Sequence, residues 1–206
     1  YIGKWDNNAW SSLGAGMDQE VNALAVDSNS NLYVGGWFYT AGSVSATRIA
    51  KWNGSTWSAL GTGMNSLVHA LAVDSSGNVY AGGEFSTAGG TSAIYIAKWN
   101  GSTWSALGTG MNNHVTALRV DSSGNLYAGG KFTTAGGLPA NYVAKWNGSS
   151  WSALGAGMNA SVQVIAFDNS GKLYVGGSFT AAGSTSAKYI GKWDNNAWSS
   201  LGAGMD

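Results

Sequence analysis

The side chains best suited to bind a ligand are a small set of aromatic, imidazole and charged groups. They are Trp37, Tyr39, His69, Glu84, His114 and Lys131. Trp37 stands outside the regular spacing of the other tryptophans, and with the nearby Tyr39 it is the best candidate to stack on a ligand. His69 and His114 are the only histidines, and two neighbouring imidazoles could form a weak metal site. Because the chain has no Cys and no carboxylate motif beside them, we expect polar surface there and no metal.

Catalytic chemistry is poorly supported. Only two Glu exist, Glu20 and Glu84, and they lie more than one repeat apart, which argues against a glycosidase-type carboxylate pair. The absence of Cys removes thiolate nucleophiles. The repeated Gly-Gly pairs lack the helix and the Lys of a phosphate-binding loop. We therefore predict no enzyme and no cofactor.

Two further sets of residues recur so regularly that packing and turn formation explain them best. Ten Trp that sit in predicted hairpins are expected to pack between repeats instead of stacking on sugars. They are Trp5, Trp10, Trp52, Trp57, Trp99, Trp104, Trp146, Trp151, Trp193 and Trp198. A recurring Asp begins a polar turn with too few carboxylates for Ca²⁺, so an Asx turn is predicted. These residues are Asp27, Asp74, Asp121 and Asp168.

Composition excludes several classes of partner. Ten Lys and Arg balance ten Asp and Glu, so there is no basic excess to hold a nucleic-acid backbone. No stretch approaches the roughly 18 apolar residues of a membrane span, so we expect no membrane insertion. Hydrophobic residues make up 44% of the chain, which is enough to form a folded core.

The positions of these residues are set by an internal repeat of 47 residues. Lys-Trp recurs at residues 4, 51, 98, 145 and 192 with no insertion or deletion. Four complete units follow, at 19–65, 66–112, 113–159 and 160–206, and residues 1–18 are identical to 189–206. With no composition shift between units, we predict one repeat domain over 1–206.

Each unit has the pattern of two β-hairpins. In the unit 66–112, an apolar run at 68–73 and a second strand at 79–83 flank a polar turn. A long polar loop at 86–93 then leads to a second hairpin, which has an Asn-Gly turn. No sustained helical period is present. Four strands and a period near 45 residues are typical of a β-propeller blade. We therefore predict an all-β β-propeller of four-stranded antiparallel blades, with four complete repeats and a half-blade hairpin at 1–18.

The repeat also resembles a known family. Each unit has a double Gly followed by an aromatic strand, Trp, Leu and a Gly-Met turn. This order is similar to the kelch repeat, with Trp where kelch proteins usually have Tyr. The double Gly occurs at Gly35-Gly36, Gly82-Gly83, Gly129-Gly130 and Gly176-Gly177. The segments 74–80 and 121–127 are similar to repeats of secreted bacterial propellers. The resemblance implies the propeller fold and an extracellular or cell-surface location.

Comparison of the units predicts that one face of the propeller varies. The turns within each hairpin are nearly constant, whereas the connections on the opposite face change from unit to unit. Variable sets are Trp37/Glu84/Lys131/Ser178, Tyr39/Ser86/Thr133/Thr180, Thr47/Ile94/Asn141/Lys188, Glu20/Leu67/His114/Ser161 and Asn22/His69/Thr116/Gln163. Two interpretations stay open: drift on an unconstrained surface, or a recognition face around a central mouth.

The leading hypothesis is a non-catalytic extracellular binding or adhesion module that takes a glycan or protein ligand. The alternative is a structural repeat protein that assembles with copies of itself, or within a longer tandem array, into rings or filaments. The duplicated hairpin supports the alternative, because either copy could complete a blade. We expect the hairpin at 1–18 to pack against the first full unit and against a second molecule.

Overall fold

The computed structural model describes residues 1–205, and every regular element in that part of the chain is a β-strand. The innermost strands are β3 (Val21–Val26), β9 (Val68–Val73), β15 (Val115–Val120) and β21 (Val162–Phe167). The second strands are β4 (Leu32–Gly36), β10 (Val79–Gly83), β16 (Leu126–Gly130) and β22 (Leu173–Gly177). The third strands are β7 (Ile49–Trp52), β13 (Ile96–Trp99), β19 (Val143–Trp146) and β25 (Ile190–Asp194). The outermost strands are β8 (Trp57–Ala59), β14 (Trp104–Ala106), β20 (Trp151–Ala153) and β26 (Ala197–Ser200).

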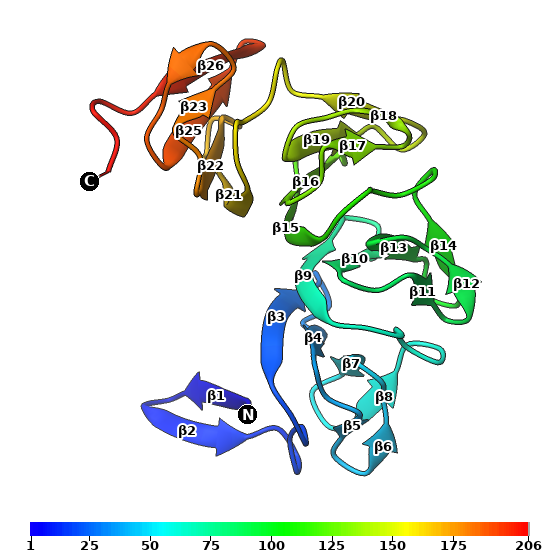
Figure 1. Cartoon of the computed structure of the whole chain (residues 1–206). Helices are drawn as coiled ribbons and strands as arrows, with labels where there is room; N and C mark the ends of the chain where they lie inside the picture. The colour runs from blue at the N-terminus through cyan, green and yellow to red at the C-terminus, as the bar shows by residue number, and fades with distance from the viewer. Residues whose placement is uncertain (206) are drawn as a thin grey trace.

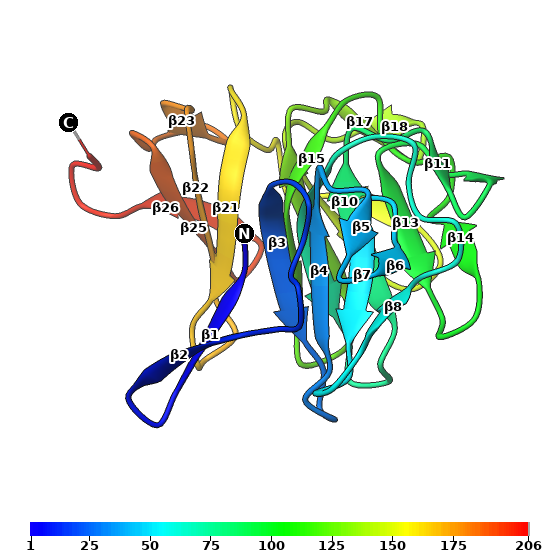
Figure 2. The ribbon, with the colours of Figure 1, turned by 90° about the horizontal axis from the view of Figure 1, so that it is seen from below.

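These strands form four antiparallel sheets, each in simple meander order, such as β3-β4-β7-β8. We call them blades 1 to 4 in chain order. Figure 1 shows the blades following an arc with their first strands toward the centre, where β3, β9, β15 and β21 lie side by side. Figure 2 shows these strands running along the axis of the arc. The predicted β-propeller architecture is confirmed.

The segment between the second and third strands, which the sequence predicts as a polar loop, has regular structure of its own. It contains a small hairpin in every blade: β5 (Thr40–Ala41) with β6 (Val44–Ser45), β11 (Thr87–Ala88) with β12 (Thr91–Ser92), β17 (Thr134–Ala135) with β18 (Leu138–Pro139), and β23 (Ala181–Ala182) with β24 (Thr185–Ser186). The cause is a side chain from the preceding connection. Asn65 Oδ1 accepts hydrogen bonds from the backbone N–H groups of Ser86 and Thr87, at 2.9 and 3.0 Å.

The recurring tryptophans pack between neighbouring blades as predicted. The indole N–H of Trp104 donates to the carbonyl oxygen of Leu60 at 2.9 Å, and Trp104 is 6% exposed. Its partner across the strand pair is Trp99, with ring centroids 5.4 Å apart. The prediction is wrong for the first hairpin, where Trp5 and Trp10 are 55% and 72% exposed. The reason is that, within residues 1–205, no blade packs against the side of the hairpin that carries these two rings.

The two residues of each double Gly make room for two different close contacts, one between blades and one within a blade. A Cβ at Gly82 would overlap Val115 of the next blade, and one at Gly83 would overlap the carbonyl oxygen of Leu67. At Gly82 any larger residue would therefore push the first strand of blade 3 away from blade 2. At Gly83 it would displace the segment that enters blade 2 itself.

The hairpin β1 (Gly3–Asp6) and β2 (Ala9–Ser12) is a half-blade. Its turn residues Asn7 and Asn8 both have positive φ, 47° and 61°, as in a type I′ turn. The segment after it packs against blade 1 as predicted, because Trp57 donates its indole N–H to the carbonyl oxygen of Leu13 at 2.8 Å. Figure 1 shows the hairpin partly occupying the opening between β21 and β3. No helix in residues 1–205 is long and apolar enough to cross a membrane.

Candidate functional site at the channel mouth

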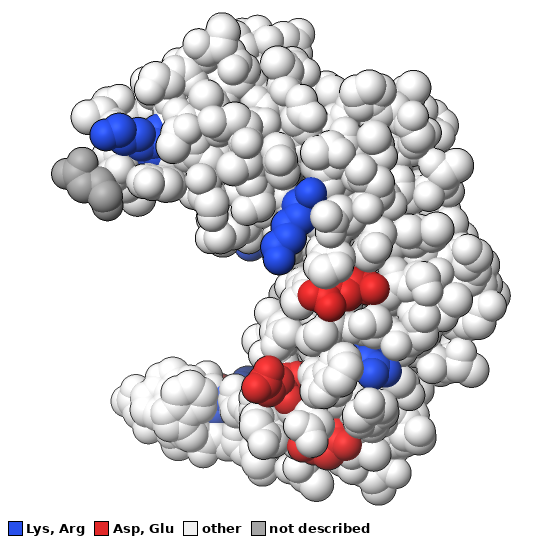
Figure 3. Space-filling view, viewed as in Figure 1, with Lys and Arg blue, Asp and Glu red and all other residues white. Residues whose placement is uncertain are grey.

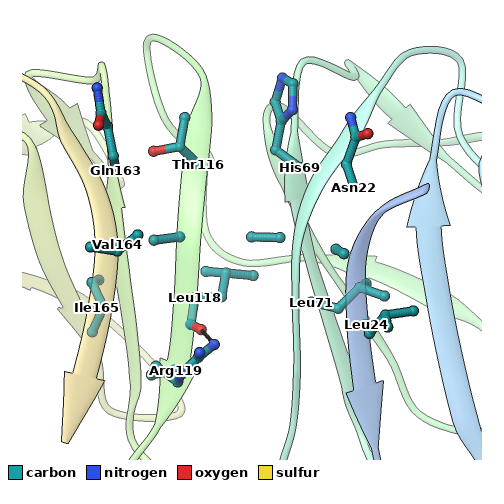
Figure 4. A pocket seen from close by; sticks show the side chains of 13 residues that line it. Asn22, Leu24, His69, Leu71, Thr116, Leu118, Arg119, Gln163, Val164 and Ile165 are labelled. Atoms are coloured by element: carbon teal, nitrogen blue, oxygen red, sulfur yellow. Dashed lines mark hydrogen bonds between the residues drawn. The ribbon is translucent and has the colours of Figure 1, made fainter. Parts of the chain in front are cut away.

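The first strands enclose a central cavity of about 310 Å³. Figure 4 shows polar side chains at one end, Asn22, His69, Thr116 and Gln163, and apolar side chains such as Leu71 and Leu118 deeper in the cavity. Arg119 lies toward the other end. The polar end is the mouth predicted from the variable positions.

A β-bulge in each first strand directs these four residues to the mouth. In β9, Ala70 pairs with Gly82 and Val68 pairs with Gly83, so His69 is the extra residue. The same irregularity places Asn22, Thr116 and Gln163 between their neighbours in β3, β15 and β21. Bulges commonly change the direction of a side chain next to a functional site. Three of the four side chains are then held by hydrogen bonds: His69 to Glu84, Thr116 to the carbonyl oxygen of Val162, and Gln163 to Ser178.

A second ring of variable residues follows the double Gly. The backbone N–H of Glu84 donates to the carbonyl oxygen of Leu67 at 2.9 Å, which ties the second strand to the connection that enters the blade. The same bond joins Trp37 to Glu20 and Lys131 to His114. The two most variable connections of each blade therefore meet at one rim. We call this rim, with the four mouth residues, the variable face.

Three of the predicted site residues come together across the boundary between blades 2 and 3. Glu84 Oε1 lies 2.9 Å from Nε2 of His69 and 3.2 Å from Nδ1 of His114. The Tyr95 ring packs beside His114, with centroids 5.4 Å apart. The hydrogen bond from His69 holds the pKa of Glu84 below its ordinary value, with the charges of His114 and Lys131 acting in the same direction. Glu84 is thus a carboxylate shared between two imidazoles.

This cluster corrects one premise of the metal argument, because a carboxylate does lie beside both histidines. The arrangement is nevertheless a hydrogen-bonded bridge. Both imidazole nitrogens are directed at the same carboxylate oxygen instead of a common vacant point. Within residues 1–205, no group of three or more His, Cys, Asp or Glu side chains is arranged to hold a metal ion.

Trp37 and Tyr39 form a separate aromatic cluster in blade 1. Their ring centroids are 6.4 Å apart in an edge-on arrangement, and they are 38% and 47% exposed. The guanidinium of Arg48 lies over both rings, 4.6 Å from the Trp37 centroid and 4.9 Å from that of Tyr39. A cation at these distances from a ring centroid is attracted to the ring face, so Arg48 stabilises both rings where they lie.

Arg48 is the residue that sequence reasoning missed. It is only 7% exposed, donates to the carbonyl oxygen of Met64 at 3.3 Å and to the hydroxyl of Tyr39 at 3.2 Å, and leaves its Nε without a partner. The signal was present in the repeat, because the other blades have Tyr95, Tyr142 and Tyr189 at this position. Arg48 is therefore the substitution that distinguishes blade 1.

The recurring Asp residues have the predicted turn role. Asp74 Oδ1 accepts the backbone N–H groups of Ser76 and Asn78, each at 2.9 Å. Its other oxygen accepts the hydroxyl of Tyr80 at 3.1 Å. Asp27 has the same arrangement, and burial together with that carboxylate raises the pKa of Tyr33 to about 12. These carboxylates are fully used in local structure.

Few charged side chains lie on the face with the mouth. Figure 3 shows acidic groups over the half of the arc nearer the N-terminus and basic groups mainly over the other half. The structure brings Lys131 close enough to affect the charge of Glu84.

The four-bladed arc, its Trp-anchored interfaces and its channel define a β-propeller. Within that class, the chain belongs to the Rax2 C-terminal beta propeller domain family, whose model matches residues 3–164. A search of curated proteins gives no significant match.

Solved structures share this fold at low sequence identity. The extracellular domain of a one-component system from B. thetaiotaomicron has a TM-score of 0.62 at 10% identity, over 94% of this chain and 24% of that one. The extracellular domain of a hybrid two-component system from the same organism gives 0.58 at 11% identity, over 89% and 22%. YCF48 bound to D1 peptide gives 0.54 at 14% identity, over 95% and 57%. This chain thus spans less than a quarter of the two extracellular domains.

Proposed function

We propose that this chain is a non-catalytic, kelch-like binding module that recognises a protein segment through the variable face. The observation that carries the proposal is the Trp37–Tyr39–Arg48 cluster. Two aromatic rings stay exposed at the rim while a buried guanidinium fixes their orientation. Rigid, half-exposed aromatic residues are the usual anchors of binding surfaces.

Charged and hydrogen-bonding groups elsewhere on the variable face support a polar ligand with an apolar anchor. His69 and Glu84 of blade 2, and His114 and Lys131 of blade 3, supply donors and acceptors on the same face. A peptide offers both an apolar side chain and backbone amides to such a surface. The peptide bound to YCF48, a protein of the same fold, is consistent with this ligand class.

We also propose that residues 1–206 act as a single repeat domain at the cell surface or outside the cell. The boundaries would be the half-blade 1–18 and the blades 19–65, 66–112, 113–159 and 160–206. The two similar extracellular domains support the location. The continuous contacts between neighbouring first strands support the single domain.

The test is selection of ligands from a displayed peptide library on the immobilised full chain, with a glycan array run in parallel. Selected peptides should bind the Trp37→Ala variant at least about tenfold more weakly, as for the loss of an aromatic anchor. The matched control is Trp10→Ala, which removes an exposed Trp outside the variable face. Binding on the glycan array, with no peptide selected from the library, would indicate a carbohydrate ligand instead. Equal loss in both variants would contradict the proposed site.

Self-assembly is a second candidate role, because the two identical hairpins also fold identically. Gly3 pairs with Ser12 as Gly191 pairs with Ser200, and Trp5 pairs with Trp10 as Trp193 pairs with Trp198. Exchange of one hairpin for the other would therefore conserve every strand pairing in the blade. Native mass spectrometry distinguishes self-assembly from ligand binding alone, because self-assembly requires rings or filaments of several copies.

A further inference from the structure

The hairpin β1–β2 has a free strand edge where every blade has a second strand. In blade 2 the third strand pairs with the second, Trp99 with Val79 and Ile96 with Gly82. The same register recurs in the other three blades. Within residues 1–205, β1 pairs only with β2. Unpaired backbone amides on such an edge favour the addition of a strand.

The wall of blade 1 that faces this edge is apolar and uncovered. Leu24 is 55% exposed, whereas its equivalents Leu71 and Leu118 are 3% and 1% exposed. Val26 beside it is 62% exposed. A cavity of about 640 Å³ separates this wall from the hairpin. The surface that each blade buries against the preceding blade is therefore exposed in blade 1.

The opposite wall, on blade 4, is uncovered in a complementary way. The space beside Gly82 is filled by Val115 and Leu118 of the next blade. Beside Gly176, the equivalent residue of blade 4, only Val164 and the carbonyl oxygen of Tyr189 from the same blade lie within 4 Å. Figure 3 shows the resulting notch, which opens the centre of the arc to the outside.

The hydrogen bond from an indole N–H to a Leu carbonyl, which joins neighbouring blades, is also missing across the notch in the part of the chain that the structure describes. Each buried hairpin Trp donates to a Leu carbonyl 44 residues earlier, as Trp198 does to Leu154 at 2.8 Å. Trp10, the exposed equivalent, forms no such bond within residues 1–205. Leu201 is the one member of the series Leu13, Leu60, Leu107, Leu154 and Leu201 that is not buried.

These uncovered surfaces are the ones that two inner strands of the same repeat would cover. We propose that the notch binds, in trans, a β-hairpin with the inner-strand sequence of this repeat, which completes a fifth blade on β1–β2. This inference goes beyond the proposed ligand of the variable face. The hairpin has the sequence of two inner strands such as 68–73 and 79–83. Its equivalents of Val68 and Leu71 face blade 4, as Val68 and Leu71 face Gly35 of blade 1. Its equivalent of Gly82 faces blade 1, as Gly82 faces Val115 of blade 3.

The strand register of the complex follows from the other blades. Trp5 pairs with the position equivalent to Val79, Lys4 with that of Tyr80 and Ile2 with that of Gly82. The Gly equivalent to Gly82 then faces Val21 and Leu24, as Gly35 faces Val68 and Leu71. Completion of the blade brings the Trp10 indole to the carbonyl oxygen of Leu201, which accepts the backbone N–H of Gly204 but no indole N–H within residues 1–205. The segment needed has 29 residues, the difference between a 47-residue unit and the 18-residue hairpin.

The test is titration of the full chain with a synthetic peptide of residues 66–94, which has no Trp. Calorimetry should show one peptide bound per chain, and Trp fluorescence should shift to shorter wavelength as Trp10 is buried. The control peptide carries Gly82→Val, because the added side chain would overlap Val21 and Leu24. We expect at least about tenfold weaker binding of this control. The chain variant Leu24→Asp should bind the unchanged 66–94 peptide more weakly by a similar factor. Its β-sheet circular dichroism should be unchanged, since Leu24 is exposed.

Absence of binding by the 66–94 peptide, or equal binding of the Gly82→Val peptide, would overturn the proposal. Sedimentation provides a further check on the proposal. A concentration-dependent dimer that the peptide fails to dissociate would overturn the proposal as well, because a second copy of the chain would then fill the notch. Failure here leaves the peptide selection on the variable face unaffected, since that surface does not include Leu24, Trp10 or β1.

Discussion

Trp57 donates its indole N–H to the carbonyl oxygen of Leu13, 44 residues earlier in the chain, at 2.8 Å. The same bond joins Trp104 to Leu60, Trp151 to Leu107 and Trp198 to Leu154. Each bond connects the outermost strand of one blade to the segment that leaves the previous blade. The repeat length of 47 residues therefore keeps every blade in the same relation to its neighbour.

Trp104→Ala should destabilise the chain by roughly 3–5 kcal/mol, because it removes a buried ring and the hydrogen bond that its indole N–H donates to the Leu60 carbonyl oxygen. The control is Trp10→Ala, the same residue type at the equivalent position of the hairpin. Since Trp10 is 72% exposed, its loss should change stability by less than about 0.5 kcal/mol. Urea unfolding of both variants measures the difference. Similar costs at the two positions would show that Trp10 is buried in solution.

Gly82→Ala should destabilise by roughly 1–3 kcal/mol, since the added methyl overlaps Val115 in a packed interface between blades. Gly176→Ala should cost less, because its nearest neighbour is the side chain of Val164, which is 62% exposed and can move aside. Thermal unfolding of the pair gives the comparison. A larger loss for Gly176→Ala would mean that blade 4 is covered.

Arg48→Tyr restores to blade 1 the residue that the other blades carry. Stability should be unchanged or higher, because the variant removes a buried guanidinium whose Nε has no partner. Binding through the variable face should weaken, since Trp37 and Tyr39 lose the group that orients them. Melting temperature and affinity for a selected peptide are measured on the same preparation. A loss of stability without a loss of affinity would make Arg48 a purely structural residue.

The pH dependence of stability should reveal the Glu84 bridge. The pKa of Glu84 is lowered from 4.5, chiefly by the hydrogen bond from His69, so the folded state favours the ionised carboxylate. Its contribution is therefore complete above pH 4.5 and is lost as the pH falls through the lowered value. Glu84→Gln should destabilise the chain at pH 6 and match the wild type at the acid end.

The control for that series is Glu20→Gln, the chain's other glutamate. Urea midpoints of the three proteins between pH 3 and 7 provide the profiles. A constant difference between wild type and Glu84→Gln over the whole range would exclude an electrostatic role for the bridge.

The architecture was predictable because it depends on a period that the sequence repeats without error. The 47-residue spacing, the Asn-Gly turns and the apolar runs indicate four strands, and the structure forms them. Trp5 and Trp10 were misjudged because recurrence does not reveal whether a neighbouring blade is present. The small hairpins such as β11–β12 were missed because Asn65, on another segment, orders them.

The candidate site was predictable residue by residue but not as an arrangement. His69, Glu84 and His114 were each identified from variation between units. Their contact depends on the β-bulge at His69 and on the packing of blade 2 against blade 3, which no local pattern encodes. Arg48 was overlooked because the comparison of units included Thr47 and its equivalents but not the next position.

Hydrogen exchange of the two identical segments tests the central claim, that one sequence lies in a half-blade at 1–17 and in a complete blade at 189–205. Peptides from the two sites are distinguished by their neighbours, Gln19 after the first and Lys188 before the second. The amides of β1 should exchange at least roughly tenfold faster than those of β25, which pair with β22. Equal protection of β1 and β25 would contradict the account, because it would require a strand already paired with β1.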